Sequence, residues 1–209
     1  DAERGDNWPS VPAPVDGYIA WYTADSISGT TWTDLSTYSN DATIGGSGYS
    51  VTSTTGNGAT KTFNVLEGTT NTTVTFPAGI LPSTYTFFHV ARYNGSSNYR
   101  IFQDSTANWL SGFWNGTSGV AFHGAWLNQS GVHGTNWVYS TDQANLYRSN
   151  GVERGTISGG TSATNLRVNI SAYGEFSDFQ IAEILVYNTE LSSADYQTTE
   201  AYLSAKYGI

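Results

Sequence analysis

Short runs in which apolar and polar residues alternate recur along most of the chain, and this period of two predicts β-strands. The longest run in the first half spans residues 84–93 (TYTFFHVARY). Both of its alternating faces are largely apolar or aromatic, which favours a central strand covered on both sides. Residues 179–187 (FQIAEILVY) form a second strong candidate. Shorter candidate strands lie at 18–22, 49–53, 61–66, 72–76, 99–103, 109–114, 119–124, 136–141, 144–149, 152–157 and 166–170.

Turn residues and prolines divide the chain. Asn150-Gly151 lies between two alternating runs and is the strongest hairpin signal in the sequence. Residues 32–43 are rich in Asp, Ser and Asn, which predicts a compact loop held by bonds from side chains to the backbone. Residues 1–15 contain three prolines and no period, which predicts a linker or an N-terminal arm. Residues 16–209 then form a single domain.

The only convincing helical pattern lies at the C-terminal end. Ser192 or Ser193 caps its start, and Gly208 stops it. The face at helical spacing comprises Tyr196, Thr199, Tyr202 and Leu203. About a dozen short strands and one terminal helix predict an all-β fold, a two-sheet antiparallel β-sandwich with a short C-terminal α-helix.

Composition excludes several classes of function. The 209 residues include 8 Lys and Arg against 17 Asp and Glu, a formal net charge of −9, which argues against nucleic acid as a partner. No apolar run approaches the roughly 20 residues of a membrane span, so no membrane insertion is expected. The absence of Cys excludes disulfides, a thiolate nucleophile and Cys-ligated zinc. Met is also absent, even at position 1, which indicates a processed product or an excised domain.

Three segments carry a resemblance to one family. The first is 17–25 (GYIAWYTAD), and the second is 32–36 (WTDLS) with 40–43 (NDAT). The third and most specific is 181–188 (IAEILVYN), followed by 191–192 (LS) and 200–208 (EAYLSAKYG). Over roughly residues 16–209 the chain resembles the concanavalin A-like lectin and glucanase sandwiches, in their laminin-G-like (LamG) branch.

The resemblance implies a two-sheet jelly roll of the kind appended to larger extracellular proteins. Other domains of a longer parent chain are therefore expected partners. Such modules commonly bind carbohydrate or other proteins through loops and the concave sheet, and many bind calcium. The implied location is extracellular, at a cell surface or a virion surface. A role in adhesion to a cell-surface or cell-wall glycan follows from it.

The middle third of the chain combines aromatic rings with amide, carboxylate and imidazole groups, which is the chemistry of a carbohydrate pocket. Indole rings stack on the C–H faces of sugars, and polar side chains bind the hydroxyls. The predicted carbohydrate-binding residues are Asp104, Asn108, Trp109, Trp114, Asn115, His123 and Trp126.

The aromatic cluster that gives this signal also contains Phe113, Phe122 and Trp137, and an alternative interpretation is that most of its rings fill the sandwich interior. Strand alternation puts Trp109 and Trp114 on opposite faces of their strand, so only one of the two can lie in the core. We therefore expect at least one exposed indole.

A calcium site would need several oxygen ligands that converge in one loop. The densest such loop holds Asp34, Asn40 and Asp41, with Asp25 nearby, and Asp142 with Asn145 is a second option. The alternative for the first loop is a structural turn. His123 and His133 lack a third ligand at metal-binding spacing, so we assign no metal ligand and keep calcium as a candidate cofactor.

The sequence contains no catalytic motif that fits a known hydrolase pattern. Glucanases of the resembled superfamily carry Glu-x-Asp-x-x-Glu, which this sequence lacks. Asp178 and Glu183 are five residues apart and point to opposite faces of a strand, and Glu183 fits a structural hydrogen-bonding role. The leading hypothesis is a non-catalytic, lectin-like module. The alternatives are a structural or protein–protein interaction module and, third, a polysaccharide-degrading enzyme.

Overall fold

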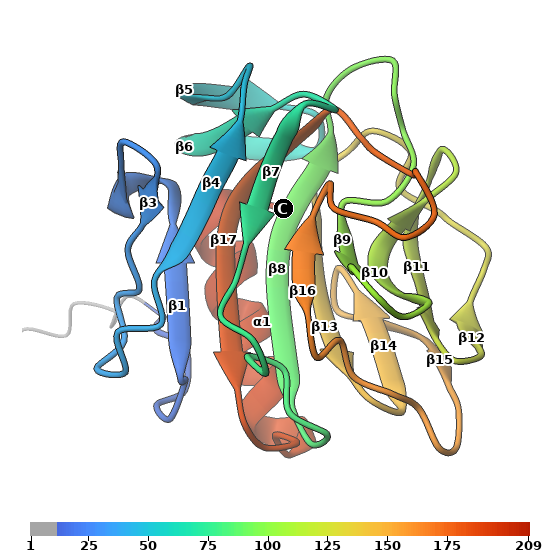
Figure 1. The fold of residues 1–209 in the computed structure, drawn as a ribbon. Coiled ribbons are helices and arrows are strands. Elements are labelled where there is room, and N and C mark those ends of the chain that lie inside the picture. The colour runs from blue at the N-terminus through green and yellow to red at the C-terminus, as the bar shows by residue number, and fades with distance from the viewer. Residues whose placement is uncertain (1–11) are drawn as a thin grey trace, which may run out of the picture.

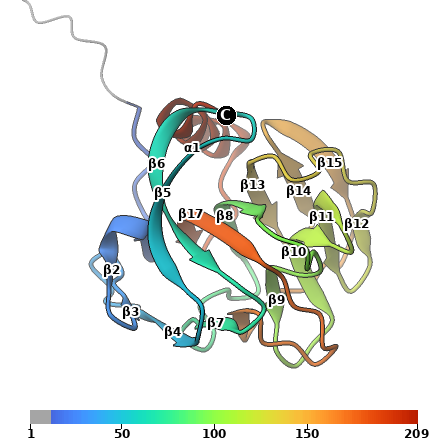
Figure 2. The same ribbon diagram turned by 90° about the horizontal axis from the view of Figure 1, so that it is seen from above.

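The structure, a computed structural model, describes residues 12–209 as two antiparallel β-sheets stacked face to face (Figure 1). One α-helix, α1 (Ser193–Tyr207), lies on the outside of one sheet, as the view from above shows (Figure 2). This is the predicted all-β sandwich with a short C-terminal helix. Residues 1–11 of the predicted N-terminal arm lie outside the described residues.

The first sheet has eight strands in the order β15-β14-β13-β8-β17-β6-β5, with β1 paired to β17. Its centre is β8, whose residues are all buried between neighbouring strands and the layers above and below. The strands are β1 (Ala20–Thr23), β5 (Ser50–Gly56), β6 (Ala59–Gly68), β8 (Thr86–Tyr93), β13 (Val138–Gln143), β14 (Leu146–Ser149), β15 (Val152–Thr156) and β17 (Phe179–Tyr187).

The second sheet has nine strands in the order β12-β11-β10-β9-β16-β7-β4-β3-β2. They are β2 (Ile27–Ser28), β3 (Thr31–Trp32), β4 (Ala42–Gly46), β7 (Thr72–Thr75), β9 (Phe102–Asp104), β10 (Trp109–Trp114), β11 (Thr117–His123), β12 (Trp126–Asn128) and β16 (Leu166–Val168). A 3₁₀ turn, η1 (Ala24–Ser26), joins β1 to β2.

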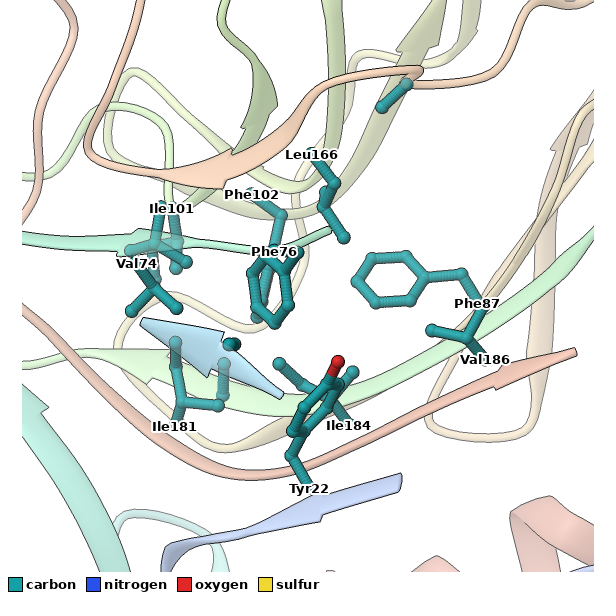
Figure 3. Packing of buried hydrophobic residues seen from close by; sticks show 14 of the residues in the cluster. Tyr22, Val74, Phe76, Phe87, Ile101, Phe102, Leu166, Ile181, Ile184 and Val186 are labelled. Carbon is teal, nitrogen blue, oxygen red and sulfur yellow. The ribbon is translucent and has the colours of Figure 1, made fainter. Parts of the chain in front are cut away.

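The core between the sheets is aromatic. The ring of Tyr22 from the eight-stranded sheet meets Phe76 of the facing layer at a centroid distance of 5.5 Å, and Phe87 meets Phe102 at the same distance. Both pairs are edge-on, the arrangement that aromatic quadrupoles favour. Figure 3 shows these rings converging from both sheets, with aliphatic side chains such as Ile184 between them.

The helix covers the outer face of the eight-stranded sheet. Ser192 caps it by accepting a hydrogen bond from the Asp195 amide, and Gly208 ends it in the left-handed conformation at φ 67°. The predicted helical face packs onto the sheet, and its members Tyr196, Thr199, Tyr202 and Leu203 are all buried.

Glu183 of β17 fixes this helix to the sheet. Its buried carboxylate accepts hydrogen bonds from the Trp21 indole at 2.6 Å and the Tyr202 hydroxyl at 2.8 Å. The ammonium of Lys206 donates at 2.7 Å, and Tyr207 donates to the same oxygen as Lys206. Glu183 therefore has the structural role expected from the sequence.

Four short strands, β2, β3, β4 and β12, were not predicted from the sequence. The sequence predicts one loop over residues 32–43, but Thr31–Trp32 and Ala42–Gly46 form β3 and β4, which lie between β2 and β7 in the nine-stranded sheet. Only the segment between them is a loop. The described end of the predicted arm is anchored, because the Val15 carbonyl accepts from Tyr187 at 2.7 Å. No helix of residues 12–209 has both the length and the apolar character needed to cross a membrane.

Candidate functional site

Strand β10 sends its indole rings to opposite sides of the nine-stranded sheet. Trp109 and Phe113 point into the core between the sheets. Trp114 points to the outer face, which we call the open face because the only α-helix of residues 12–209 packs on the other sheet. The predicted division of these rings between two faces is therefore correct.

Three rings gather on the open face. The Trp114 and Trp126 rings lie 5.0 Å apart at 57°, and Phe122 meets Trp126 edge-on at 5.2 Å. All three side chains are partly exposed. We call them the aromatic trio. Strand pairing explains the cluster, because Phe122 of β11 is in register with Trp126 of β12.

The middle of the open face is covered by the segment 170–178. Gln103 of β9 donates to the Glu175 carbonyl at 3.2 Å, and Arg100 forms an ion pair with the Glu175 carboxylate. The Arg100 guanidinium also lies 4.7 Å from the ring centroid of Tyr173. The trio lies on β10, β11 and β12, away from these contacts, and its side chains are partly exposed.

Polar groups beside the trio are few. Asn115 follows Trp114 in a tight turn at φ 48°, and its side chain is exposed. Asn128 is already engaged, because its amide donates to the Gly119 and Ser130 carbonyls at 2.7 and 3.0 Å. Asn108 is exposed but begins the opposite end of β10. At about 3.3 Å per residue it lies roughly 20 Å from Trp114.

Trp109 and His123 are sealed in the interior, so their predicted contact with a surface glycan is not supported. Their rings stack at 5.1 Å with only 7° between the planes, and neither side chain is exposed. His123 contacts the Asp142 carboxylate at 3.1 Å, and Asp142 accepts from the Tyr85 hydroxyl at 2.8 Å. His123, Asp142 and Tyr85 thus provide hydrogen-bond partners for one another where the two sheets meet.

Asp104 is likewise buried and organises a turn instead of facing a ligand. One oxygen accepts from the backbone and hydroxyl of Thr106 and from the Ala107 amide, at 2.7–2.9 Å. The other accepts from the Asn165 amide at 2.9 Å. Burial opposes ionisation of this carboxyl, but these hydrogen bonds outweigh it and hold its pKa below the usual value.

A second histidine, His89, lies in the interior on β8. Its ring contacts the Ser111 hydroxyl at 3.0 Å, and both side chains are fully buried. Desolvation lowers the pKa of His89 to about 3, so the ring is neutral at physiological pH. The pair joins β8 of one sheet to β10 of the other.

The acidic loop considered for calcium is a hydrogen-bonded turn. One oxygen of Asp34 accepts from the Trp21 and Ser36 amides at 2.8 Å, and the other accepts from the Ser36 hydroxyl and the Asn40 amide. Asp41 accepts from the Asp34 amide at 2.9 Å. In residues 12–209 no group of three or more His, Asp and Glu side chains converges as a metal site would require. Calcium binding stays a prediction.

Other carboxylates near the strand ends are engaged separately. Asp178 accepts from the Thr70 and Ser97 amides at 3.2 and 3.1 Å, which fixes two loops. Glu175 pairs with Arg100, and Glu183 lies beneath the helix.

Similarity to known proteins is found in the structure and not in the sequence. No protein-family model and no curated protein matches the sequence. Domain 4 of AbnA, a GH43 extracellular arabinanase from Geobacillus stearothermophilus, in complex with arabinotriose, is similar with a TM-score of 0.62 and 16% identity. The match covers 88% of this chain and 97% of that domain.

Two further solved structures share the architecture. Trypanosoma rangeli sialidase in complex with sialic acid has a TM-score of 0.59 at 10% identity, over 92% of this chain and 34% of the sialidase. The binding domain of botulinum neurotoxin DC in complex with SialylT has a TM-score of 0.55 at 13% identity, over 91% of this chain and 51% of that chain. The chain therefore spans about a third of the first and half of the second. At these identities the likeness shows the fold, a β-sandwich that carbohydrate-binding and carbohydrate-processing proteins contain.

Proposed function

We propose that this protein is a non-catalytic glycan-binding module of a larger extracellular or surface-attached protein, and that the aromatic trio holds the sugar. The observation that carries the proposal is the pair of indoles, Trp114 and Trp126, left partly exposed on the face without a helix. The complexes of structural neighbours with arabinotriose and with SialylT support it. Membership of the laminin-G-like branch is part of the same proposal.

The chemistry of the trio suits a sugar ring. The C–H face of a pyranose or furanose stacks on an indole, and two indoles at 57° contact adjoining faces of one bound chain. The exposed amide of Asn115 supplies a donor and an acceptor for hydroxyl groups. Affinity for one sugar is modest because hydroxyls exchange bonds with water for bonds with protein. Several copies on one surface then give adhesion through avidity.

The absence of catalysis is the second part of the proposal. The two carboxylates of the segment that covers the open face, Glu175 and Asp178, are held in an ion pair and in backbone hydrogen bonds instead of facing each other. Incubation of the protein with mixed polysaccharides tests this directly. Release of reducing sugar above a denatured-protein control contradicts it.

A glycan array tests the binding site. The wild type is compared with Trp114→Ala and Trp126→Ala, and Tyr49→Ala serves as a matched control on a partly buried ring outside the trio. We expect binding to at least one glycan, with both Trp variants reduced about tenfold or more and the control unchanged, because an aromatic anchor supplies roughly 1–2 kcal/mol.

Melting temperatures measured in parallel exclude unfolding as the cause. Wild-type binding by both Trp variants contradicts the site. A wild type that binds no glycan but self-associates through the trio instead supports the alternative, a protein–protein interaction module.

A further inference from the structure

A cavity of about 290 Å³ lies at the edge of the sandwich opposite the aromatic trio. It opens between the chain that enters β1 and the loop between β3 and β4, the blue elements of Figure 1, whereas the trio lies at β10–β12. Its volume is near the lower end of the roughly 300–1,000 Å³ of ligand pockets, the size for one small ring. The lining residues are Asp16, Gly17, Tyr18, Leu35, Ser36, Thr37 and Tyr38.

One wall of this cavity is fixed by the buried carboxylate of Asp34. It holds the amides of Ser36 and Asn40 at 2.8 Å, while the Ser36 hydroxyl donates to the Ile19 carbonyl at 3.0 Å. Ser39 is kept in the left-handed region at φ 56° by the same turn. The loop is therefore preorganised against β1, which lowers the entropy lost when a ligand binds.

The opposite wall is fixed by ring packing. Tyr18 meets Trp21 edge-on at 5.2 Å and Tyr187 at 6.2 Å, so its ring is attached to the cluster beneath helix α1. Tyr38 and Leu35 are held out of the core, with 62% and 46% of their surfaces exposed. A rigid phenol, an exposed phenol and an exposed leucine thus border one hollow.

The polar groups of the lining define the ligand class. The hydroxyls of Tyr38 and Thr37 can donate and accept, and Asp16 accepts, whereas Tyr18 contributes a ring that packs beneath the helix. None of the seven lining residues is Lys or Arg, so the lining offers an anionic ligand no cationic side chain, and Asp16 would repel it. Apolar ring faces with hydroxyl and carboxylate partners match a neutral, hydroxylated ring.

We propose that this cavity is a second saccharide subsite, which takes one neutral sugar residue. It extends the proposed function to two separate sites on one domain, but it stands on different residues from the trio. A domain with sugar sites at opposite edges can bridge two glycan chains, which raises avidity without a second copy.

Ligand-observed saturation-transfer NMR tests the subsite with neutral methyl glycosides of arabinose, glucose, galactose, mannose and N-acetylglucosamine. The proteins are the wild type, Tyr38→Ala, Tyr38→Phe and the double variant Trp114→Ala/Trp126→Ala. We expect at least one glycoside to bind the wild type and the double variant alike. Tyr38→Ala should weaken that binding about fivefold or more, and Tyr38→Phe should weaken it less because the ring remains.

Several outcomes overturn the subsite. They are no glycoside signal with the wild type, an unchanged signal in Tyr38→Ala, and a signal lost only in the double variant. A saturation-transfer signal from choline chloride, tested in place of the glycosides, would assign the hollow to a cationic amine and would also overturn the saccharide subsite. The double variant lacks both indoles of the trio, so glycoside binding that it retains does not come from the trio. A negative glycan array would therefore contradict the proposed function without contradicting the subsite.

Discussion

The two sides of strand β10 use the same residue types for different purposes. Trp109, on the inside, is sealed and stacked on His123 at 5.1 Å. Trp114, five positions later on the outside, leans on Trp126 and keeps part of its ring in solvent. Buried polar side chains surround Trp109, whereas almost no buried polar side chain surrounds Trp114. The comparison separates the groups that hold the sheets together from those that can meet a ligand.

The inner layer contains the groups that resemble catalytic chemistry, namely His89 with Ser111 and His123 with Asp142. Each pair is fully buried and bridges strands of both sheets. Buried polar groups need partners, and these side chains provide most of them, although His89 Nδ1 has none among the described residues. In this protein, the pairing of a histidine with a serine or a carboxylate is therefore part of the packing between the two sheets. Accessible rings, not titratable groups, mark the candidate site.

The largest effect should come from the inner indole. Trp109→Ala removes a fully buried ring between the sheets and is expected to lower the free energy of unfolding by about 3–5 kcal/mol. Urea denaturation followed by circular dichroism measures the change. A loss below roughly 1 kcal/mol would show that the inner and outer indoles do not differ in packing.

Acidification should act on the inner layer through His89. Burial lowers its pKa to about 3, against about 6.5 in the unfolded chain, so the folded state disfavours the proton. The stabilisation is complete above pH 6.5 and is lost as the pH falls from 6.5 toward 3. The free energy of unfolding should therefore be roughly 3 kcal/mol lower at pH 4 than above pH 6.5.

The variant His89→Gln isolates this contribution from the carboxylates that also titrate. The difference in unfolding free energy between wild type and variant should shrink as the pH falls from 7 to 4. A difference that is constant with pH means that His89 is not the neutral, buried group the geometry describes.

A smaller loss of stability is expected from Asp104→Asn. The carboxylate accepts four hydrogen bonds, and an amide has one oxygen to replace two. The expected cost is about 1–3 kcal/mol in urea denaturation, with glycan-array binding unchanged. Loss of binding with full stability would instead return Asp104 to the carbohydrate site predicted from the sequence.

Much of the fold could be predicted because its strongest elements carry local signals. Residues 179–187 form β17 with the predicted bounds, residues 109–114 form β10, and the Asn150-Gly151 pair joins β14 to β15. The helix is predicted equally well because Ser192 and Gly208 mark its ends. The short strands β2, β3, β4 and β12 were missed because two to five residues give too little alternation, and pairing with neighbours defines them instead.

The site could be predicted only in part. Alternation states that Trp109 and Trp114 face opposite sides, but the packing of the other sheet decides which side is buried. Trp114, Trp126 and Asn115 are on the surface as required, whereas Trp109, His123 and Asp104 are in the interior. Phe122 belonged to the predicted aromatic cluster but not to the predicted carbohydrate-binding residues. Its register with Leu110 and Trp126 was the available signal, because cross-strand partners share one face.

The smallest change in stability should come from the outer indole, and it makes the comparison quantitative. Trp114→Ala removes a ring that contacts Trp126 but lies partly in solvent, so the cost should stay below about 1 kcal/mol. Acrylamide quenching of tryptophan fluorescence should then reach a smaller fraction of the emission than in the wild type, because an accessible indole is gone. Trp109→Ala, measured under conditions where it stays folded, should leave the quenchable fraction equal or larger. If the two variants lose the same quenchable emission, then the open face does not expose its ring, and a sugar could not stack there.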